Sequence, residues 1–413
     1  MAGLVALATV ATAVGLAAGG GGHPTKAAAD IVVSPRLRPL LARTVVVPGT
    51  PPALGWPAQG EGAVAVQGIG LVGASPHQRI LPIASLTKMM TAYVVLHDHP
   101  LAPGQSGPSL VMAAHDVAAY VAETQADNSN VPVRLGERLS ELQLLEALLL
   151  PSADNIADRL GVWDAGSDPA FVARMNATAR ALGLLHTHYA DASGLDPRSR
   201  STAADQARLA SDLMALPVVR AIVVHPSLPF PVAGTVPNYN PALGTDGIVG
   251  VKSGFTPQAQ GCLAVSAYRI VGGRHVLVVA VSLDQPDALY GAARAAERLL
   301  GGATAALLAL SPSPTGTPVA TAAASWAGTT ATARAAPGAV PTVGWPGLRL
   351  VRTLAPVLLR PTTAPGAASI RTRSPQVVGR LVVHAPWGID GGGPVVTSRP
   401  LPPVPAGYVP PVG

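Results

Sequence analysis

The chain contains few cysteines, lysines and aromatic residues, and these shortages limit which metal sites, cross-links and kinds of core it can form. Cys262 is the single cysteine among 413 residues, so neither an internal disulfide nor a cysteine-cluster metal site can form. Aromatic residues make up 4% of the chain and charged residues 12%, whereas 48% of the residues are hydrophobic. The core must therefore be built from Val, Leu, Ile and Ala, and a chain this apolar can bury enough surface to fold.

Lysine is scarce in a chain that otherwise uses arginine as its basic residue. Of 28 Lys and Arg residues, three are lysines: Lys26, Lys88 and Lys252. An ammonium group can lose its proton in a dry site, whereas a guanidinium group cannot. A lysine retained against this background is therefore a candidate for chemistry.

Acidic residues are almost absent from the last part of the chain. Residues 301–413 contain eight Arg, no Lys and one acid, Asp390, so the net charge of +6 belongs to this part. The arginines are scattered rather than clustered, so no nucleic-acid partner is expected. They fit better with an anionic surface such as a membrane or an acidic wall polymer.

Composition divides the chain into segments. Residues 2–18 are uncharged and apolar, which favours a signal peptide or an N-terminal anchor. Either would imply export, with membrane association through the N-terminus. The alternative is a buried N-terminal helix. The expected segments are a signal peptide or anchor at 1–29, a linker at 30–54, a compact domain at 55–302, an Ala/Pro/Thr-rich linker at 303–340, a small β domain at 341–402 and a disordered tail at 403–413.

The compact domain has strand patterns at its ends and helical patterns in its middle. The expected strands are 63–67, 248–252, 262–270 and 275–283, and the expected helices are 137–150, 169–183, 202–216 and 286–300. Ser140 and Gln143 form a candidate capping box at the first of these helices. We therefore expect an α/β (α+β) fold, in which terminal strands pair in one antiparallel sheet flanked by helices, with a helical subdomain.

The strongest local motif is Ser85-Leu86-Thr87-Lys88, which precedes an apolar helical run. Residues three apart share a helix face, so Ser85 and Lys88 are expected to be neighbours. A serine hydroxyl becomes a strong nucleophile when a base takes its proton, and a desolvated lysine can be that base. One such match is weak by itself, because an ordinary helix start can have the same letters.

Two further motifs follow in order. Ser152-Ala153-Asp154 comes after the 137–150 helix, and Lys252-Ser253-Gly254 ends a strand candidate. This order of S-x-x-K, S-x-D/N and K-S-G resembles the motif set of penicillin-binding proteins and β-lactamases. Over roughly residues 55–302 the chain resembles a low-molecular-mass penicillin-binding protein, a serine D-alanyl-D-alanine carboxypeptidase of the actinobacterial type.

The resemblance implies a β-lactamase/transpeptidase-like fold and a role for each motif residue. Ser85 would be the acylated nucleophile, Lys88 the general base and Ser152 a proton relay. Lys252 would keep Lys88 deprotonated and attract the terminal carboxylate of the substrate, which Ser253 would also bind. The backbone amides of Ser85 and Phe255 would form the oxyanion hole, and Gly254 would let the substrate approach the strand.

The resemblance also implies the reaction and its setting. The enzyme would remove the terminal D-Ala from peptidoglycan stem pentapeptides through an acyl-enzyme, and β-lactam antibiotics would acylate the same serine. No metal or other cofactor is expected. The substrate places the protein outside the cytoplasm, secreted or anchored at the cell wall.

Asp154 departs from the family pattern, in which asparagine is usual. An asparagine can donate an N–H to the substrate carbonyl, whereas an ionised aspartate can only accept. We expect Asp154 to be ionised between Lys88 and Lys252, or neighbouring Asn155 to supply the donor. Asp154 supports one alternative to a carboxypeptidase, an inactive homologue that binds wall peptide. A β-lactamase, which would need rapid deacylation, is the other alternative.

Overall fold

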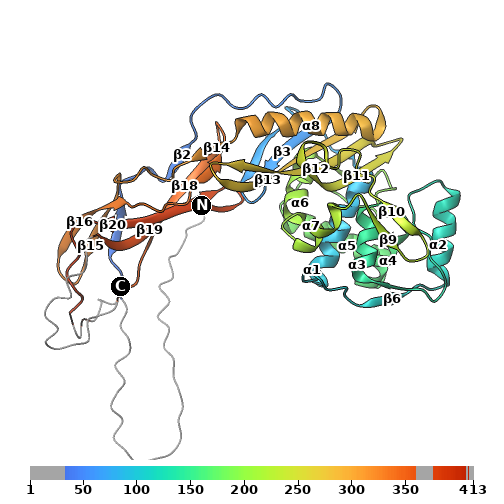
Figure 1. Ribbon diagram of the computed structural model, residues 1–413, viewed down its shortest axis with the longest axis horizontal. Coiled ribbons are helices and arrows are strands. Elements are labelled where there is room, and N and C mark those ends of the chain that lie inside the picture. Colours follow the sequence, from blue (N-terminus) through green and yellow to red (C-terminus); the bar gives the residue numbers. More distant parts are fainter. Residues whose placement is uncertain (1–32, 360–374, 406–407, 409–413) are drawn as a thin grey trace, which may run out of the picture.

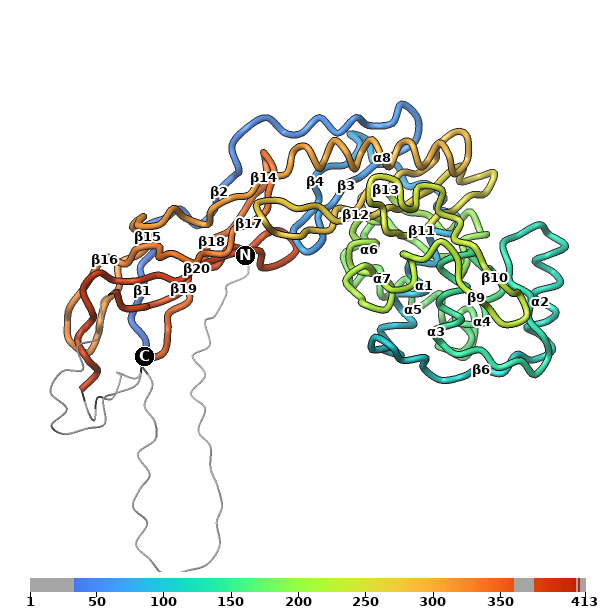
Figure 2. The backbone as a smooth tube through the Cα atoms, viewed as in Figure 1, coloured from blue at the N-terminus to red at the C-terminus, as the bar shows by residue number. Residues whose placement is uncertain are grey.

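The computed structural model describes residues 33–359, 375–405 and 408. The expected signal peptide or anchor at 1–29 lies outside the described residues, as does most of the tail expected to be disordered. The described chain forms two bodies side by side along one long axis (Figures 1 and 2). One contains the motif residues, and the other is a β domain, by which we mean residues 33–54 and 307–405.

The motif-bearing body is organised on a five-stranded antiparallel sheet with the order β11-β12-β13-β3-β4. Its strands are Glu61–Val66 (β3), Gly70–Ala74 (β4), Ile248–Thr256 (β11), Gln260–Val271 (β12) and Arg274–Gln285 (β13). The first strand of the body pairs with one of the last, because Ala63 lies opposite Val281. This confirms the expected antiparallel sheet built from both ends of the domain.

Side chains that alternate along the strands give the sheet two buried faces. Val64 and Val66 pack on the face that α8 covers, whereas Ala63 and Ala65 pack on the face toward the other helices. Figure 1 shows this layering. The helices are Thr87–Asp98 (α1), Ala114–Gln125 (α2), Glu141–Leu149 (α3), Asp154–Ala165 (α4), Asp168–Ala181 (α5), Ala203–Leu213 (α6), Pro217–Val223 (α7) and Ala288–Ala306 (α8).

The helices expected from periodicity are present, with small shifts at their ends. The capping box before α3 is confirmed, because Ser140 Oγ accepts from the Gln143 amide and Gln143 Oε1 accepts from the Ser140 amide. Cys262 is fully buried in β12. No helix in the described part of the chain has the length and apolarity that a membrane span requires.

Short elements complete the motif-bearing body. Two 3₁₀ turns are Ala84–Leu86 (η1) and Thr245–Gly247 (η2). Three small antiparallel pairs of strands are Leu81–Pro82 (β5) with Arg200–Ser201 (β8), Ser109–Val111 (β6) with Arg138–Ser140 (β7), and Ser227–Phe230 (β9) with Gly234–Pro237 (β10).

The β domain is a seven-stranded sheet with the order β1-β15-β16-β20-β19-β18-β2. Its strands are Arg36–Pro39 (β1), Thr44–Val46 (β2), Pro318–Ala324 (β15), Thr329–Ala335 (β16), Arg349–Pro356 (β18), Gln376–Ala385 (β19) and Gly388–Thr397 (β20). Leu308–Leu310 (β14) and Thr342–Gly344 (β17) form a separate pair.

The prediction of linkers at 30–54 and 303–340 is wrong at the residues that form β1, β2, β15 and β16. β1 and β2 join the C-terminal sheet through pairs such as Arg36 with Ala323 and Thr44 with Val351. Within β15 the alternate residues Ala320, Ala322 and Ala324 are buried. Alanine has a low strand propensity, so composition alone suggested a linker, but pairing with neighbours and burial decide the outcome.

Candidate active site

Ser85 lies at the middle of η1, directly before α1 begins at Thr87. Ala84 before it has φ +47°, a left-handed conformation that L-residues adopt at a cost and that clusters at functional sites. The Lys88 Nζ is 2.9 Å from the Ser85 Oγ. The expected neighbourhood of the two side chains is therefore present, although Ser85 belongs to a 3₁₀ turn rather than to α1.

Lys88 is fully buried, and its ammonium group has three polar contacts. Nζ lies 2.9 Å from Ser85 Oγ, 2.5 Å from Asp154 Oδ1 and 2.9 Å from the Ser193 carbonyl oxygen. A neutral amine keeps two N–H donors and gains one lone pair. The same geometry therefore lets neutral Lys88 donate to Asp154 and Ser193 while it accepts the proton of Ser85.

Asp154 is the first residue of α4, and 2% of it is exposed. Burial raises the pKa of its carboxyl group, and the adjacent Lys88 charge opposes that rise. We expected Asp154 to lie between two lysines, but it bonds only Lys88. The Nζ of Lys252 instead donates to the Ser253 carbonyl oxygen at 2.8 Å.

Asn155 cannot supply the donor that Asp154 lacks. Its Nδ2 donates to the Val131 carbonyl oxygen at 3.0 Å, and its Oδ1 accepts from the Val131 amide at 3.2 Å. Both ends of the amide group are used in tying α4 to the segment before α3, so the expected substitution of Asn155 for Asp154 is wrong.

Ser152 lies between α3 and α4 with φ +63° and lines the same cavity as Ser85. Its Oγ is buried and has no hydrogen-bond partner among the described residues. The expected relay contacts with the two lysines are therefore not formed here, and the hydroxyl is free to bond an incoming group.

The third motif lies on β11, the edge strand of the five-stranded sheet. Ser253, Gly254 and Phe255 line the cavity, whereas Lys252 is 1% exposed. Burial lowers the pKa of Lys252 well below its usual value, and the positive charge of Lys88 adds to this effect. An anionic group entering the site would oppose both effects and favour the ammonium form.

Gly254 is required by a close approach of two backbones. A Cβ at this position would lie 2.8 Å from the Ser85 amide nitrogen. Gly194, with φ +90°, approaches η1 from the other side, where a Cβ would lie 1.9 Å from the Ala84 carbonyl oxygen. The turn that contains Ser85 is thus held between β11 and the turn at residues 191–196.

That turn also contributes to the site, although none of the three sequence motifs includes it. Asp191 Oδ2 accepts from the Gly194 amide at 2.9 Å and from Ser193 Oγ at 2.9 Å. This orients the Ser193 carbonyl toward Lys88, and Leu195 lines the cavity. A backbone carbonyl carries no residue-type signature, so the Lys88–Ser193 contact could not be read from sequence.

The cavity beside Ser85 has a volume of about 430 Å³. It is lined by Ser85, Ser152, Asp154, Leu195, Tyr239, Ser253, Gly254, Phe255, Thr256, Pro257, Leu289 and residues 126–129. Of the residues to which the sequence assigns a role, all line it directly except Lys88 and Lys252, which are buried. The segment 126–129, Tyr239 and Leu289 were not anticipated, and no motif marks them.

Comparisons with known proteins identify the family of the chain. Residues 70–286 match the D-alanyl-D-alanine carboxypeptidase family. A D-alanyl-D-alanine endopeptidase of Pseudomonas aeruginosa is 31% identical over 55% of this chain and 74% of its own length. A D-alanyl-D-alanine carboxypeptidase of Mycobacterium tuberculosis is 34% identical over 48% of this chain and 65% of its own length.

Solved structures show the same fold. The Streptomyces K15 DD-transpeptidase has a TM-score of 0.52 at 24% identity, over 63% of this chain and all of that chain. A peptidoglycan synthesis regulatory factor of Streptococcus pneumoniae has a TM-score of 0.60 at 19% identity, over 83% of this chain and 99% of that chain. With its family match spanning more than half of its length, the chain belongs to the D-alanyl-D-alanine carboxypeptidase family of serine peptidases.

Proposed function

We propose that this chain is a serine D,D-carboxypeptidase that removes the terminal D-Ala from peptidoglycan stem pentapeptides, with Ser85 as nucleophile. The observation that carries the proposal is the 2.9 Å contact between Ser85 Oγ and Lys88 Nζ at the wall of a cavity that Ser253 and Gly254 also line. A buried amine in contact with a serine hydroxyl is the arrangement that nucleophilic catalysis needs.

In the acylation step, neutral Lys88 takes the Ser85 proton while Ser85 Oγ forms a bond to the carbonyl carbon of the penultimate D-Ala. The peptide bond to the terminal D-Ala breaks once its nitrogen receives a proton, for which the free Ser152 hydroxyl is the nearest candidate carrier. Lys252 and Ser253 bind the terminal carboxylate. Water then hydrolyses the ester, which releases the tetrapeptide and restores Ser85.

The oxyanion that forms during both steps needs hydrogen-bond donors. We assign this role to the backbone amides of Ser85 and Phe255. The close approach of Gly254 to the Ser85 amide supports the assignment, because it brings the β11 backbone beside η1. The chemistry requires side chains and backbone of this chain and no cofactor. A β-lactam amide would be attacked in the same way by Ser85.

The substrate class sets the proposed location. Peptidoglycan stem peptides lie outside the cytoplasmic membrane, so we place the protein there, secreted or anchored. The apolar run at 2–18 supports export and membrane association through the N-terminus. We also propose that the chain consists of a catalytic domain from about residue 55 to residue 306 and the β domain.

A fluorescent penicillin tests the proposal. Labelling of the natural chain that persists supports a carboxypeptidase, labelling that decays within seconds indicates a β-lactamase, and no labelling indicates a binding protein. Ser85→Ala should abolish labelling and D-Ala release without changing the melting temperature, because the hydroxyl adds little to packing. Ser227→Ala, an exposed serine on β9, is the matched control. A penicilloyl adduct on Ser85→Ala, detected by intact mass spectrometry, would refute the assignment.

A further inference from the structure

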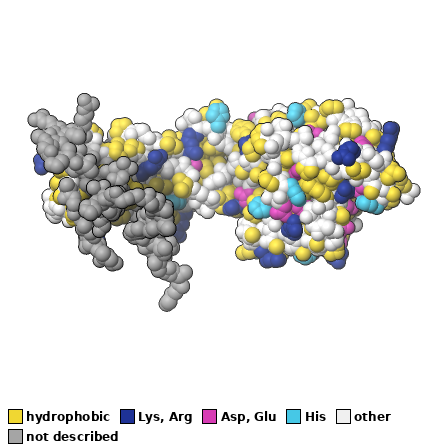
Figure 3. All heavy atoms as spheres, turned by 90° about the horizontal axis from the view of Figure 1, so that it is seen from below, with side chains coloured by type: hydrophobic (Ala, Val, Ile, Leu, Met, Phe, Trp, Pro, Cys, Tyr) yellow, Lys and Arg dark blue, Asp and Glu magenta, His cyan; other side chains and the backbone are white. Residues whose placement is uncertain are grey.

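The β domain carries a large uncompensated positive charge. Its described arginines are Arg36, Arg38, Arg43, Arg334, Arg349, Arg352, Arg380 and Arg399. Its single acid, Asp390, is already used, because it accepts from Arg274 Nη1 at 3.0 Å and from the Val343 amide at 2.8 Å. None of these eight arginines forms an ion pair within the described part of the chain. On the face in Figure 3, acidic side chains gather on the catalytic domain.

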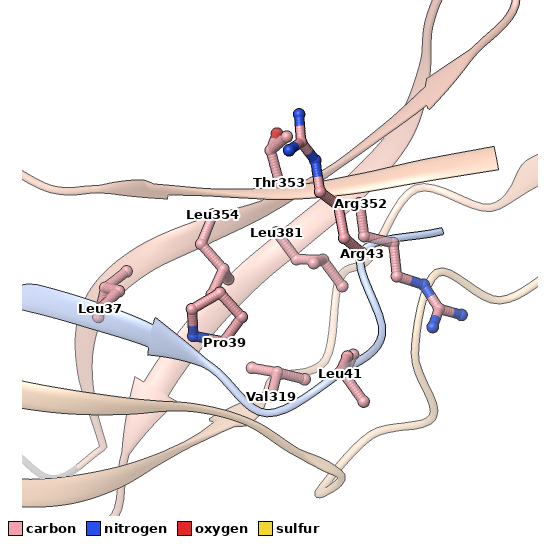
Figure 4. A pocket seen from close by; sticks show the side chains of 9 residues that line it. All are labelled: Leu37, Pro39, Leu41, Arg43, Val319, Arg352, Thr353, Leu354 and Leu381. Carbon is pink, nitrogen blue, oxygen red and sulfur yellow. The ribbon is translucent and has the colours of Figure 1, made fainter. Parts of the chain in front are cut away.

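The same domain contains an apolar cleft of about 230 Å³. It is lined by Leu37, Pro39, Leu41, Val319, Leu354 and Leu381, with Arg43, Arg352 and Thr353 beside them. Figure 4 shows Arg43 and Arg352 at the end of the cleft opposite Leu37, with their guanidinium groups pointing in different directions. The backbones of the two residues lie next to each other, because the Arg352 amide donates to the Arg43 carbonyl oxygen at 2.7 Å.

Apolar side chains that lie close in sequence to cleft residues are also exposed. Leu40 follows a cleft residue and is 54% exposed, and Leu358 follows β18 and is 73% exposed. An apolar groove with cations at one end is complementary to an amphiphile, whose chain fits the groove and whose anionic head meets the cations. A hydrophilic polyanion would satisfy the arginines but would leave the apolar surface in water.

We propose that the β domain binds a membrane containing anionic phospholipids, with part of an acyl chain in this cleft and lipid phosphates near Arg43 and Arg352. The position of the apolar run at 2–18 supports this occupant. Fourteen residues, 19–32, join it to Val33, whose amide donates to the Leu359 carbonyl oxygen in the β domain. Fourteen residues reach at most about 50 Å, so a membrane-bound N-terminus keeps this domain near the lipid.

Such docking also orients the catalytic domain. Figures 1 and 2 show β15 and β16 at one end of the long axis, and β9, β10 and α2 at the other. With the cleft on the membrane, the end of the molecule that carries β9, β10 and α2 lies far from the lipid contact along this axis.

The experiment measures vesicle binding of the full chain, so that the apolar N-terminal run is present in every variant. Vesicles of phosphatidylcholine alone and of phosphatidylcholine mixed with phosphatidylglycerol are compared by sedimentation. Each arginine near an anionic surface is worth about fivefold in binding. Arg43→Gln with Arg352→Gln should therefore lower the preference for the anionic vesicles about 25-fold. Arg138→Gln with Arg180→Gln, two exposed arginines of the catalytic domain, removes the same charge as a control.

A second double variant tests the apolar part without altering charge. Leu40→Ser with Leu358→Ser changes exposed side chains and should weaken binding to the anionic vesicles about tenfold. Equal effects of the two arginine pairs would overturn the proposal. The proposal would also be overturned if the leucine substitutions had no effect and soluble polyphosphate displaced the protein from the vesicles. That result would identify a wall-type polyanion as the partner. Melting temperature and penicillin labelling verify that each variant is folded.

Discussion

Replacement of Asp154 by asparagine tests the electrostatics of Lys88, the proposed general base, most directly. Asp154→Asn preserves size, removes a charge 2.5 Å from Lys88 Nζ and adds an N–H donor facing the cavity. With Asp154 ionised, the Lys88 ammonium has each of its three protons directed at an acceptor. Removal of the negative charge favours the neutral amine, which is the form that accepts the Ser85 proton.

The size of the effect depends on two opposed influences. A contacting opposite charge shifts a titration by about one to three pH units. Burial raises the pKa of Asp154 itself, so the carboxyl group carries its charge less fully than an exposed one would. The lower end of the range applies: the rising limb of acylation against pH should move down by about one unit. Near pH 7 that equals an acylation rate about tenfold higher.

The assay is the second-order acylation rate with a slowly reacting penicillin between about pH 6 and pH 10. Asp158→Asn serves as the control, because Asp158 is a partly buried aspartate on α4 whose pKa burial raises to about 7, but it does not line the cavity. We expect its profile to stay close to that of the natural chain.

A slower rate for Asp154→Asn at every pH would refute this reasoning. It would mean that the aspartate accepts or orients a proton during acylation and is an adapted part of the site. An unchanged profile would mean that Asp154 is already neutral in the working enzyme.

Three further substitutions probe the roles of single groups. Lys88→Arg should lose acylation almost completely, because a guanidinium cannot accept a proton, and Lys252→Arg should lose less; the reverse order of penicillin labelling rates would exchange the two roles. Gly254→Ala should slow labelling at least about tenfold through its clash with the nucleophile's amide, whereas Gly301→Ala, which meets open space, should not. Burial raises the pKa of Glu141 from 4.5 to about 7, so the free energy of unfolding decreases as pH rises through that interval. Glu141→Gln should therefore raise the melting temperature at pH 8 and not at pH 5.

The sequence was informative wherever a local rule decides the structure. The hairpin between β12 and β13 turns at Gly272 and Gly273, which both have positive φ, as a tight hairpin turn requires. The capping box at Ser140 placed the start of α3 within a residue. Motif order placed Ser85, Lys88 and Lys252 in one site because each lies next to a recognisable element.

Sequence reasoning failed where the deciding contact is distant or involves backbone alone. The segment of β1 pairs with β15, nearly three hundred residues later, and nothing in its Pro-rich composition marks that partner. Lys88 bonds the Ser193 carbonyl, which any residue type could provide. Asn155 has a side chain that could bind a substrate, but both ends of its amide group form hydrogen bonds with the Val131 backbone.

The position of the domain boundary is decided by the shared core rather than by composition. One buried cluster contains Val64 and Leu299 of the catalytic domain together with Val343, Trp345 and Val383 of the β domain. The boundary expected at residue 302 falls inside α8, which continues to Ala306 and leads directly into β14. A truncation there would cut a helix and expose apolar surface on both sides of the cut, at a cost proportional to the area uncovered. The two domains therefore stabilise each other, and a membrane contact made by one fixes the orientation of the other.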